Sequence, residues 1–460
     1  MRWLPLILAL ATGSPALAAK PVAEVDIVRA GDAFRAEYVL KADAPAWVFS
    51  DSILPREGKT SFRADSWTIE TPGVRLERHG WYDVLVAEKG NVPRKVRIRV
   101  MPYVKDIEAS NDAALAFSDG SVALYDGKFK LVPAASAAAF AEAPIDSDRL
   151  PGVDRPTVVK FRDPGRKLLA LGQRREAIAL PDVGTYVLFG AVRADERAAI
   201  VTIIDPQLPA WLDHYLASET PKILASYARD MGPPPGNRPT LMVSWNGPKA
   251  GLTSMGGSVL PDMIVMTFEG DGIVRENRDV ANAARWFISH EAAHFWLGRA
   301  IAYDNPQQGW ITEGGADLLA VRAVASNDPA FDVKGRLQGA LDRCAAFLAK
   351  GGVTTANERG DHKAYYDCGA IIAMAAEQAS GGNFAKFVRA LIKRAGADAI
   401  VTRAEWLGLM EERAPGRGLP EAIGVLLDGK AADPNAAIAE LLRRAGIAFT
   451  LDAQGRPQLS

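Results

Sequence analysis

The spacing of apolar residues changes once along this 460-residue chain, near residue 206, and that change limits the folds open to it. Before it, short runs of β-branched and aromatic residues alternate with polar ones, as at residues 34–40 and 95–100. Such alternation, broken by glycine, proline and aspartate, is typical of antiparallel strands in a sandwich or barrel. After it, apolar residues recur mostly at helical spacing. We therefore predict a β-rich first half and a largely helical second half.

The second half is expected to open with one helix and two strands. Residues 211–227 have helical spacing, and the proline-rich run at 232–236 ends that helix. Strand-like runs at 239–245 and 263–268 are expected to be separated by a glycine-rich turn at 251–257. The remaining chain is expected to be helical up to one or two closing strands after residue 447. The helices predicted there are residues 285–300, 313–325, 334–348, 366–379, 384–394 and 436–444.

The first eighteen residues have the pattern of a secretory signal peptide. Arg2 supplies positive charge, residues 4–11 are apolar, and Ala16-Leu17-Ala18 is a small-residue cleavage site. This apolar run is too short to span a bilayer, and no later run approaches the ~20 residues that a spanning helix needs. We therefore expect an exported protein, in the periplasm or the medium, without a transmembrane segment in the mature chain.

Charge content bears on the expected partners, and cysteine content on disulfide formation and metal binding. The 54 lysines and arginines nearly balance the 55 aspartates and glutamates, and no basic run would follow a phosphate backbone, so nucleic acid is not an expected partner. Cys344 and Cys368 are the two cysteines. Export would let them form a disulfide, and two buried free thiols is the alternative. Neither lies at metal-ligand spacing from another cysteine or histidine.

A candidate metal site lies in residues 286–296, a segment without proline or glycine. His290 and His294 are four residues apart, so on a helix both imidazoles point from one face and can bind a single Zn²⁺. Glu291, next to the first histidine, would face the open position and can take a proton from the attacking water. The alternative is a pair of histidines that only cap or pair on a helix.

Glu313 supplies the third ligand that a catalytic zinc site needs. Eighteen residues separate it from His294, and the intervening turn at residues 304–306 lets a second helix fold back onto the first. Asp317, one turn after Glu313, would face the same way and accept the free ring N–H of one zinc-binding histidine. An ordinary surface carboxylate is the alternative for Asp317.

This arrangement resembles the gluzincin metallopeptidases, most closely the family that includes aminopeptidase N, leukotriene hydrolase and the glycyl aminopeptidases. That family carries His-Glu-x-x-His, eighteen residues, and then Glu in a Trp-Leu-x-Glu-Gly-x-Ala-like segment. The residues that match it are His290, Glu291, His294, Glu313, Trp296, Gly298, Trp310, Gly314 and Ala316. The resemblance is specific over residues 286–319 and implies one Zn²⁺ per chain and a peptide or protein substrate.

The resemblance also implies a domain organisation and a tyrosine that stabilises the oxyanion. The family has a tyrosine at a helix start whose phenol stabilises the oxyanion, and the matching segment here begins at Tyr366, with Tyr365 as the fallback. Cys368 stands where the family has lysine. The predicted plan is a signal peptide at 1–18, a β-rich domain at 19–206, an α+β thermolysin-like catalytic domain at 207–330, and a helical part at 331–460 that completes the cleft.

The family's exopeptidase loop is the main departure. In the family, a Gly-x-Met-Glu-Asn segment on an edge strand pairs with the peptide, and its glutamate holds the free amine. The counterpart here, residues 251–263, keeps glycines, among them Gly256 and Gly257, but has no glutamate, and Asp262 is its one carboxylate. Gly256 and Gly257 are therefore the substrate-binding candidates, and a plain hairpin turn is the alternative.

We predict an exported zinc metallopeptidase, aminopeptidase-like in its zinc motif, with exopeptidase or endopeptidase action left open. The alternative from another class is a non-catalytic protein that uses the zinc fold to bind a peptide or an envelope partner. It is motivated by the missing glutamate and by Cys368. Zinc-dependent hydrolysis of a non-peptide substrate would use the same residues.

Overall fold

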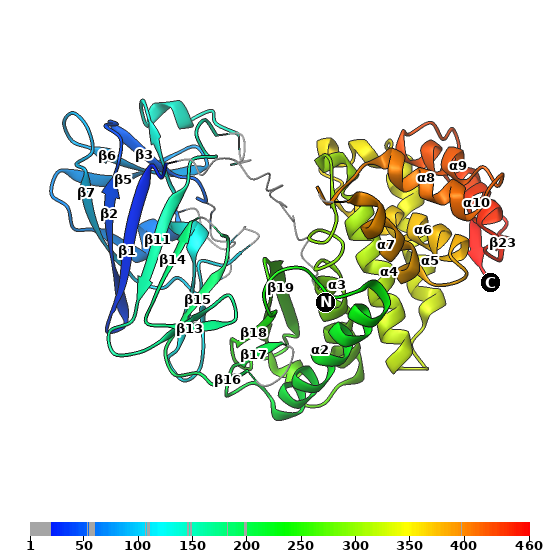
Figure 1. Ribbon diagram of the computed structural model, residues 1–460, viewed down its shortest axis with the longest axis horizontal. Helices are drawn as coiled ribbons and strands as arrows, with labels where there is room; N and C mark the ends of the chain where they lie inside the picture. Colours follow the sequence, from blue (N-terminus) through cyan, green and yellow to red (C-terminus); the bar gives the residue numbers. More distant parts are fainter. Residues whose placement is uncertain are drawn as a thin grey trace. The chain divides into compact units, whose positions relative to one another are not determined.

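The computed structural model describes residues 20–52, 54, 60–105, 107, 111–144, 147, 150–181, 183–196, 200–396 and 398–460. The expected signal peptide lies outside these ranges. The described chain forms two compact units, one of residues 20–208 with 237–272 and the other of residues 209–236 with 273–460. The first unit is built mainly of strands and the second mainly of helices (Figure 1), which confirms the predicted β-rich first half and helical second half.

Three sheets form most of the strand-rich unit over the described residues. A six-stranded sheet has the order β14-β11-β1-β2-β7-β4, a four-stranded sheet β10-β3-β6-β5, and a five-stranded sheet β13-β12-β15-β9-β8. A short helix, α1 (Phe62–Ser66), precedes β4. The strands are β1 (Ala23–Ala30), β2 (Ala33–Leu40), β3 (Ala46–Phe49), β4 (Trp67–Ile69), β5 (Val74–His79), β6 (Tyr82–Ala87), β7 (Lys95–Val100), β8 (Ala114–Ala116), β9 (Val122–Tyr125), β10 (Leu131–Ala134), β11 (Thr157–Arg162), β12 (Leu168–Ala170), β13 (Gln173–Arg175), β14 (Ala177–Pro181) and β15 (Tyr186–Phe189).

Alternation of buried and exposed side chains explains why these segments pair as strands. On β2, Phe34, Ala36, Tyr38 and Leu40 are buried while the residues between them are exposed. Successive side chains of a strand point to opposite faces, so one face of the sheet enters the core and the other meets solvent. The antiparallel register of β1 with β2 runs from Ala23↔Leu40 to Ala30↔Ala33 around a two-residue turn.

A further five-stranded sheet completes this unit, in the order β16-β17-β18-β20-β19. Its strands are β16 (Ala194–Asp195), β17 (Val201–Ile204), β18 (Thr240–Trp245), β19 (Ser254–Leu260) and β20 (Met263–Glu269). β18 is parallel to both β17 and β20, and β19 is antiparallel to β20. The glycine-rich turn predicted at residues 251–257 is thus wrong from Ser254 onward, because that stretch is the edge strand β19.

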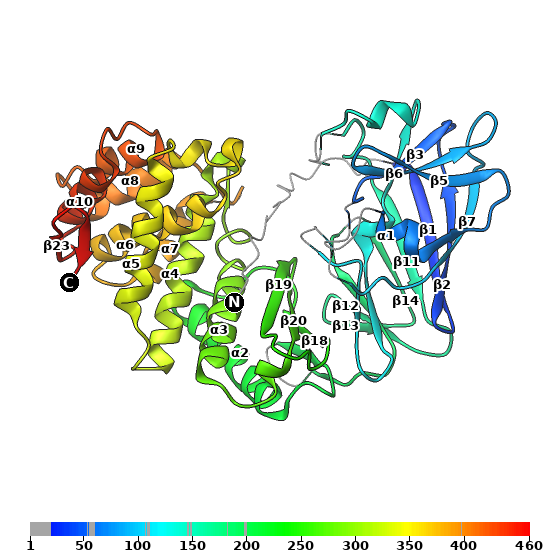
Figure 2. The same ribbon diagram turned by 180° about the vertical axis from the view of Figure 1, so that it is seen from behind.

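The helical unit is built from α2 (Ala210–Met231), α3 (Arg278–Ala293), α4 (Trp310–Asn327), α5 (Val333–Leu348), α6 (Lys363–Ala379), α7 (Phe384–Ala395), α8 (Arg403–Arg413), α9 (Leu419–Leu427) and α10 (Pro434–Ala445). α4 packs against α3 and α6, and α6 also packs against α5 (Figure 2). Short strands β21 (Ala302–Tyr303) and β22 (Ile400–Val401) pair with each other, and β23 (Phe449–Leu451) with β24 (Pro457–Leu459) closes the chain. The predicted helices and closing strands are therefore present, with shifted ends.

Two further features bear on the predictions from sequence. Cys344 on α5 and Cys368 on α6 form a disulfide, so the alternative of two free thiols is wrong. Within the described ranges, no helix combines the length and the apolar character needed to cross a membrane.

Candidate metal centre

Helix α3 carries both histidines of the motif. Asn277 caps its first turn by accepting hydrogen bonds from the backbone N–H groups of Asp279 and Val280. The helix ends at Ala293, earlier than the predicted residue 300, and His294 is its C-terminal cap. The cause is a tight turn in which Gly298 has φ 135°, a conformation that only glycine adopts readily, and donates its N–H to the carbonyl of Ile301.

That turn fixes the orientation of the His294 ring. His294 Nδ1 lies 2.9 Å from the carbonyl oxygen of Leu297. A carbonyl only accepts hydrogen bonds, so Nδ1 carries the proton and Nε2 presents a lone pair. The Nδ1 atom of His290 lies at ion-pair distance, 2.8 Å, from a carboxylate oxygen of Asp317. The Nε2 atoms of the two histidines lie 3.1 Å apart.

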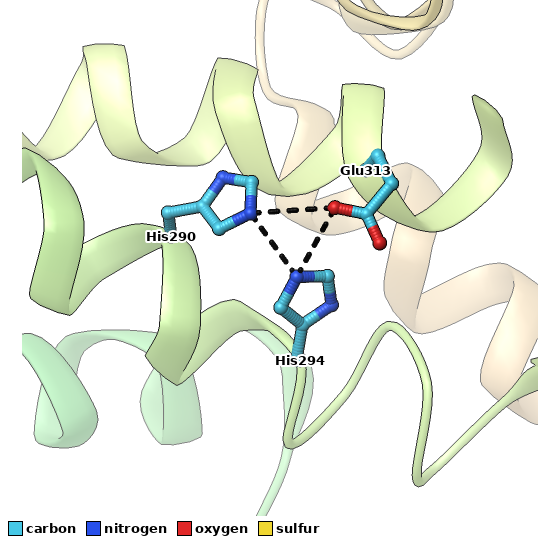
Figure 3. A group of neighbouring side chains, drawn as sticks. All are labelled: His290, His294 and Glu313. Atoms are coloured by element: carbon cyan, nitrogen blue, oxygen red, sulfur yellow. Dashed lines mark hydrogen bonds and ion pairs between the residues drawn. The ribbon is translucent and has the colours of Figure 1, made fainter. Parts of the chain in front are cut away.

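Glu313, in the first turn of α4, completes a triangle of donor atoms. Its Oε2 lies 3.4 Å from His290 Nε2 and 3.5 Å from His294 Nε2. Figure 3 shows both rings and the carboxylate pointing toward one common point. Donors about 2.0–2.1 Å from one tetrahedral ion lie roughly 3.3–3.4 Å apart, so the observed edges fit Zn²⁺. Three lone-pair donors this close repel one another unless a cation lies between them. Among the described residues, these three form the one buried group of this kind.

Glu291 lies beside this triangle as a buried carboxylate. Its residue is 2% exposed, and among the described residues its Oε2 has no hydrogen-bond partner. Burial raises the pKa of the Glu291 carboxyl, and the neighbouring carboxylate of Glu313 raises it further, while the adjacent imidazoles oppose the shift. A buried carboxylate oxygen without a partner is costly in a merely structural role, and it is therefore a candidate proton acceptor.

Tyr366, in the first turn of α6, lies against the His290 ring. The two rings are nearly parallel, with centroids 5.7 Å apart. The centroid of the Trp286 ring lies 5.3 Å from that of the His290 ring. Burial raises the pKa of the Tyr366 phenol, and the charges of Glu313 and Glu291 add to the shift, so the phenol stays protonated and able to donate. The fallback residue, Tyr365, instead faces Gly309.

Side chains behind α3 hold it in place. The Tyr227 hydroxyl on α2 donates to the carbonyl of Ser289, and Trp296 Nε1 donates to the carbonyl of Gly232. Arg285 pairs with Glu219 of α2 and donates through Nε to the carbonyl of Ala323 on α4, 2.9 Å away. The two motif helices are therefore tied both to each other and to α2.

The substrate-binding candidates lie in the other compact unit. Gly256 and Gly257 are on edge strand β19, opposite Thr267 and Met266 of β20. A Cβ at Gly256 would meet no atom within 4 Å. Asp262 lies in the turn between β19 and β20 with φ 59°, and its carboxylate accepts two hydrogen bonds from Asn237, which precedes β18.

The structure thus brings His290, His294, Glu313, Glu291, Asp317 and Tyr366 together within the helical unit. Sequence reasoning did not find the Leu297 carbonyl, because backbone contacts leave no residue-type signal. It also did not find Trp286 as a neighbour of His290, although the spacing of four residues on one helix could have indicated it.

The site belongs by its donors to the class of buried His₂Glu centres with an adjacent carboxylate. No family model matches the sequence, and no curated protein is significantly similar to it. Among solved structures, the chain is similar to an M1 zinc metallopeptidase from Deinococcus radiodurans, at 13% identity and a TM-score of 0.48 over 92% of this chain and 96% of that one. It is also similar to leukotriene A4 hydrolase from Saccharomyces cerevisiae, at 11% identity and a TM-score of 0.49 over 88% of this chain and 66% of that one.

Proposed function

We propose that this protein is a zinc-dependent peptidase that binds one Zn²⁺ through His290, His294 and Glu313. The observation that carries the proposal is the triangle of donor atoms, with edges of 3.1, 3.4 and 3.5 Å, beside the buried carboxylate of Glu291. A purely structural zinc site usually has four protein ligands, whereas three leave a position for water or substrate.

The proposed chemistry is hydrolysis of a peptide bond. When bound, Zn²⁺ supplies Lewis acidity, which lowers the pKa of water and polarises a carbonyl group. Glu291 takes the proton of the attacking water at its carboxylate and returns it to the leaving amine. Tyr366 donates its phenolic O–H to the carbonyl oxygen as negative charge develops there. Asp317 and the Leu297 carbonyl keep the two histidines in the tautomer that offers Nε2.

The decisive variant is Glu291→Gln, which keeps the size of the side chain and removes the base. We expect zinc content near one per chain, as in the wild type, and a fall in kcat of at least about 100-fold. Metal analysis and a fluorogenic peptide assay measure the two quantities. Peptide cleavage at the wild-type rate by the variant would refute the mechanism. A zinc-loaded wild type that cleaves no peptide would favour the zinc-fold binding protein or a non-peptide substrate.

The choice between exopeptidase and endopeptidase depends on how a peptide is held. Among the described strands, β19 is at the edge of its sheet, and its Gly256 and Gly257 carry no side chain that would obstruct an added strand, so they remain the candidates for substrate binding. No glutamate accompanies them at residues 251–263. Matched peptides with free and acetylated N-termini decide the question. Cleavage of only the free-amine series indicates an aminopeptidase, and cleavage of both indicates an endopeptidase.

We further propose that the protein is exported. The pattern at residues 1–18 is one support, and the Cys344–Cys368 disulfide, which persists in oxidising compartments, is another. N-terminal sequencing of the mature chain from its native host tests this, with cleavage expected near Ala18. A chain that begins at Met1 in the cytoplasm would contradict export.

A further inference from the structure

The three residues that follow Tyr366 each tie helix α6 to a neighbouring helix. Asp367 forms a bidentate ion pair with Arg343 of α5, with Nη2 2.8 Å from Oδ1 and Nε 3.0 Å from Oδ2. Cys368 forms the disulfide with Cys344, also on α5. Gly369 meets the backbone of Gly314 on α4, so closely that a Cβ on Gly314 would come within 2.0 Å of the Gly369 carbonyl carbon.

These links directly follow Tyr366, which lies in the first turn of α6. Tyr366 is the fourth residue of α6, and terminal turns lack part of the backbone hydrogen bonding that stabilises a helix interior. An oxyanion donor must also be placed within a fraction of an ångström, because a misplacement of about 1 Å can cost about 100-fold in rate. The first turn of α6 therefore needs support that its own helical bonds do not supply.

Two of the links join consecutive residues on both helices. Arg343 and Cys344 of α5 meet Asp367 and Cys368 of α6, so the pair of contacts restrains rotation of α6 as well as its distance from α5. Gly314, which directly follows Glu313, contacts Gly369, so α6 also packs against the helix that bears the third donor. These contacts therefore fix the position of Tyr366 relative to Glu313 and the metal centre.

We propose that the Cys344–Cys368 disulfide and the Arg343–Asp367 ion pair are positioning residues that hold the Tyr366 hydroxyl where the proposed hydrolysis needs it. We name these four residues the α5–α6 clamp. This inference rests on the proposed function, since it concerns Tyr366 in that reaction. Loss of the clamp should lower kcat and leave zinc content and KM unchanged.

The test is a double-mutant cycle with Tyr366→Phe. Cys344→Ala/Cys368→Ala and Arg343→Met are each made in the wild type and in the Tyr366→Phe background. In the wild type, we expect kcat to fall about 10-fold to 100-fold. In the Tyr366→Phe background, the same changes should alter kcat by less than about 2-fold, because the group they position is already gone. Equal losses in both backgrounds would overturn the proposal.

Arg322→Met is the matched control. Arg322 of α4 also makes a bidentate ion pair with a carboxylate of α6, that of Glu377. The exposures match, with Arg322 and Glu377 at 39% and 6%, and Arg343 and Asp367 at 50% and 8%. Glu377 lies ten residues after Asp367, which is about 15 Å along the helix. The control should lose comparable stability and keep its kcat, and a parallel fall in kcat would indicate a merely structural role.

A second readout works without activity. In protein containing 3-fluorotyrosine, the ¹⁹F resonance of Tyr366 is assigned by its absence from Tyr366→Phe. We expect one sharp resonance in the wild type and Arg322→Met, and broadening or a shift in Arg343→Met and the cysteine variant. If the cysteine variant does not fold, Arg343→Met alone carries this test, because it leaves the disulfide intact. An unchanged resonance in every clamp-deficient protein would refute the inference even if no peptide were cleaved.

Discussion

At the level of single residues, Asp317 supports the metal site without being one of its proposed ligands. It is 14% exposed, faces His290 Nδ1 at 2.8 Å, and is not one of the three converging donors. The matching contact for His294 is the Leu297 carbonyl, which no side-chain substitution removes. Asp317 therefore allows the orientation of the His290 imidazole to be tested while the imidazole itself is kept.

Asp317→Ala should weaken zinc binding by about 10-fold to 100-fold, because His290 loses the carboxylate that lies 2.8 Å from its Nδ1 and orients its ring. Competition against a chromophoric chelator measures the affinity. Asp342→Ala, at an exposed carboxylate of α5, is the control and should leave it unchanged. A zinc affinity in Asp317→Ala equal to that of the control would show that Asp317 is an ordinary surface carboxylate.

The residues of the site were more predictable than the contacts that support them. His290, Glu291 and His294 follow from helical periodicity, which is local, and Glu313 from ligand chemistry at a fixed spacing. The Arg343–Asp367 pair and the Gly314–Gly369 approach depend on which helices meet, and no local pattern encodes that. Residues 254–257, the first part of β19, were predicted as a turn because glycine is depleted in strands, yet the pairing of β19 with β20 overrides that preference.

At the level of elements, the crossing of α4 and α6 depends on glycine at both contact positions. Glu313 and Tyr366 reach the same centre from these two helices, so a wider crossing would move one relative to the other. A Cβ at Gly314 would lie 2.0–2.5 Å from backbone atoms of Gly369 and Ala370, and backbone cannot rotate aside as a side chain can. A methyl group at Gly314 therefore cannot be accommodated unless α4 and α6 move apart.

Gly314→Ala should destabilise the protein by about 1–3 kcal/mol through overpacking. Gly408→Ala on α8 is the matched helical control, because the nearest atom to its added methyl is the end of a flexible arginine side chain at 3.6 Å. That variant should be neutral or stabilised by up to about 1 kcal/mol. Thermal and urea unfolding compare the two, and equal stability would mean that α4 and α6 can separate without cost.

At the level of the whole molecule, the chain order and the compact units do not coincide. Residues 237–272 lie between α2 and α3 in sequence but group with the strand-rich unit. β18 pairs in parallel with β17, from Val201↔Thr240 to Ile204↔Val243. Buried apolar residues of this segment also pack with the β15 strand, and the shared cluster includes Met242, Met263, Val265, Tyr186 and Leu188. The predicted boundary at 206/207 falls directly after β17, between strands that belong to one sheet.

A fragment of residues 207–460 should therefore fail to fold as an independent catalytic part, although it contains every proposed metal ligand. Removing β17 leaves β18 with an unpaired edge and uncovers Met242 and Met263, which are 0% and 2% exposed in the intact chain. Exposed edges of this kind promote aggregation. Size-exclusion chromatography and zinc analysis of the fragment, beside residues 20–460, provide the comparison. A monomeric fragment that binds one zinc would show that the strands before residue 207 are dispensable for the metal centre.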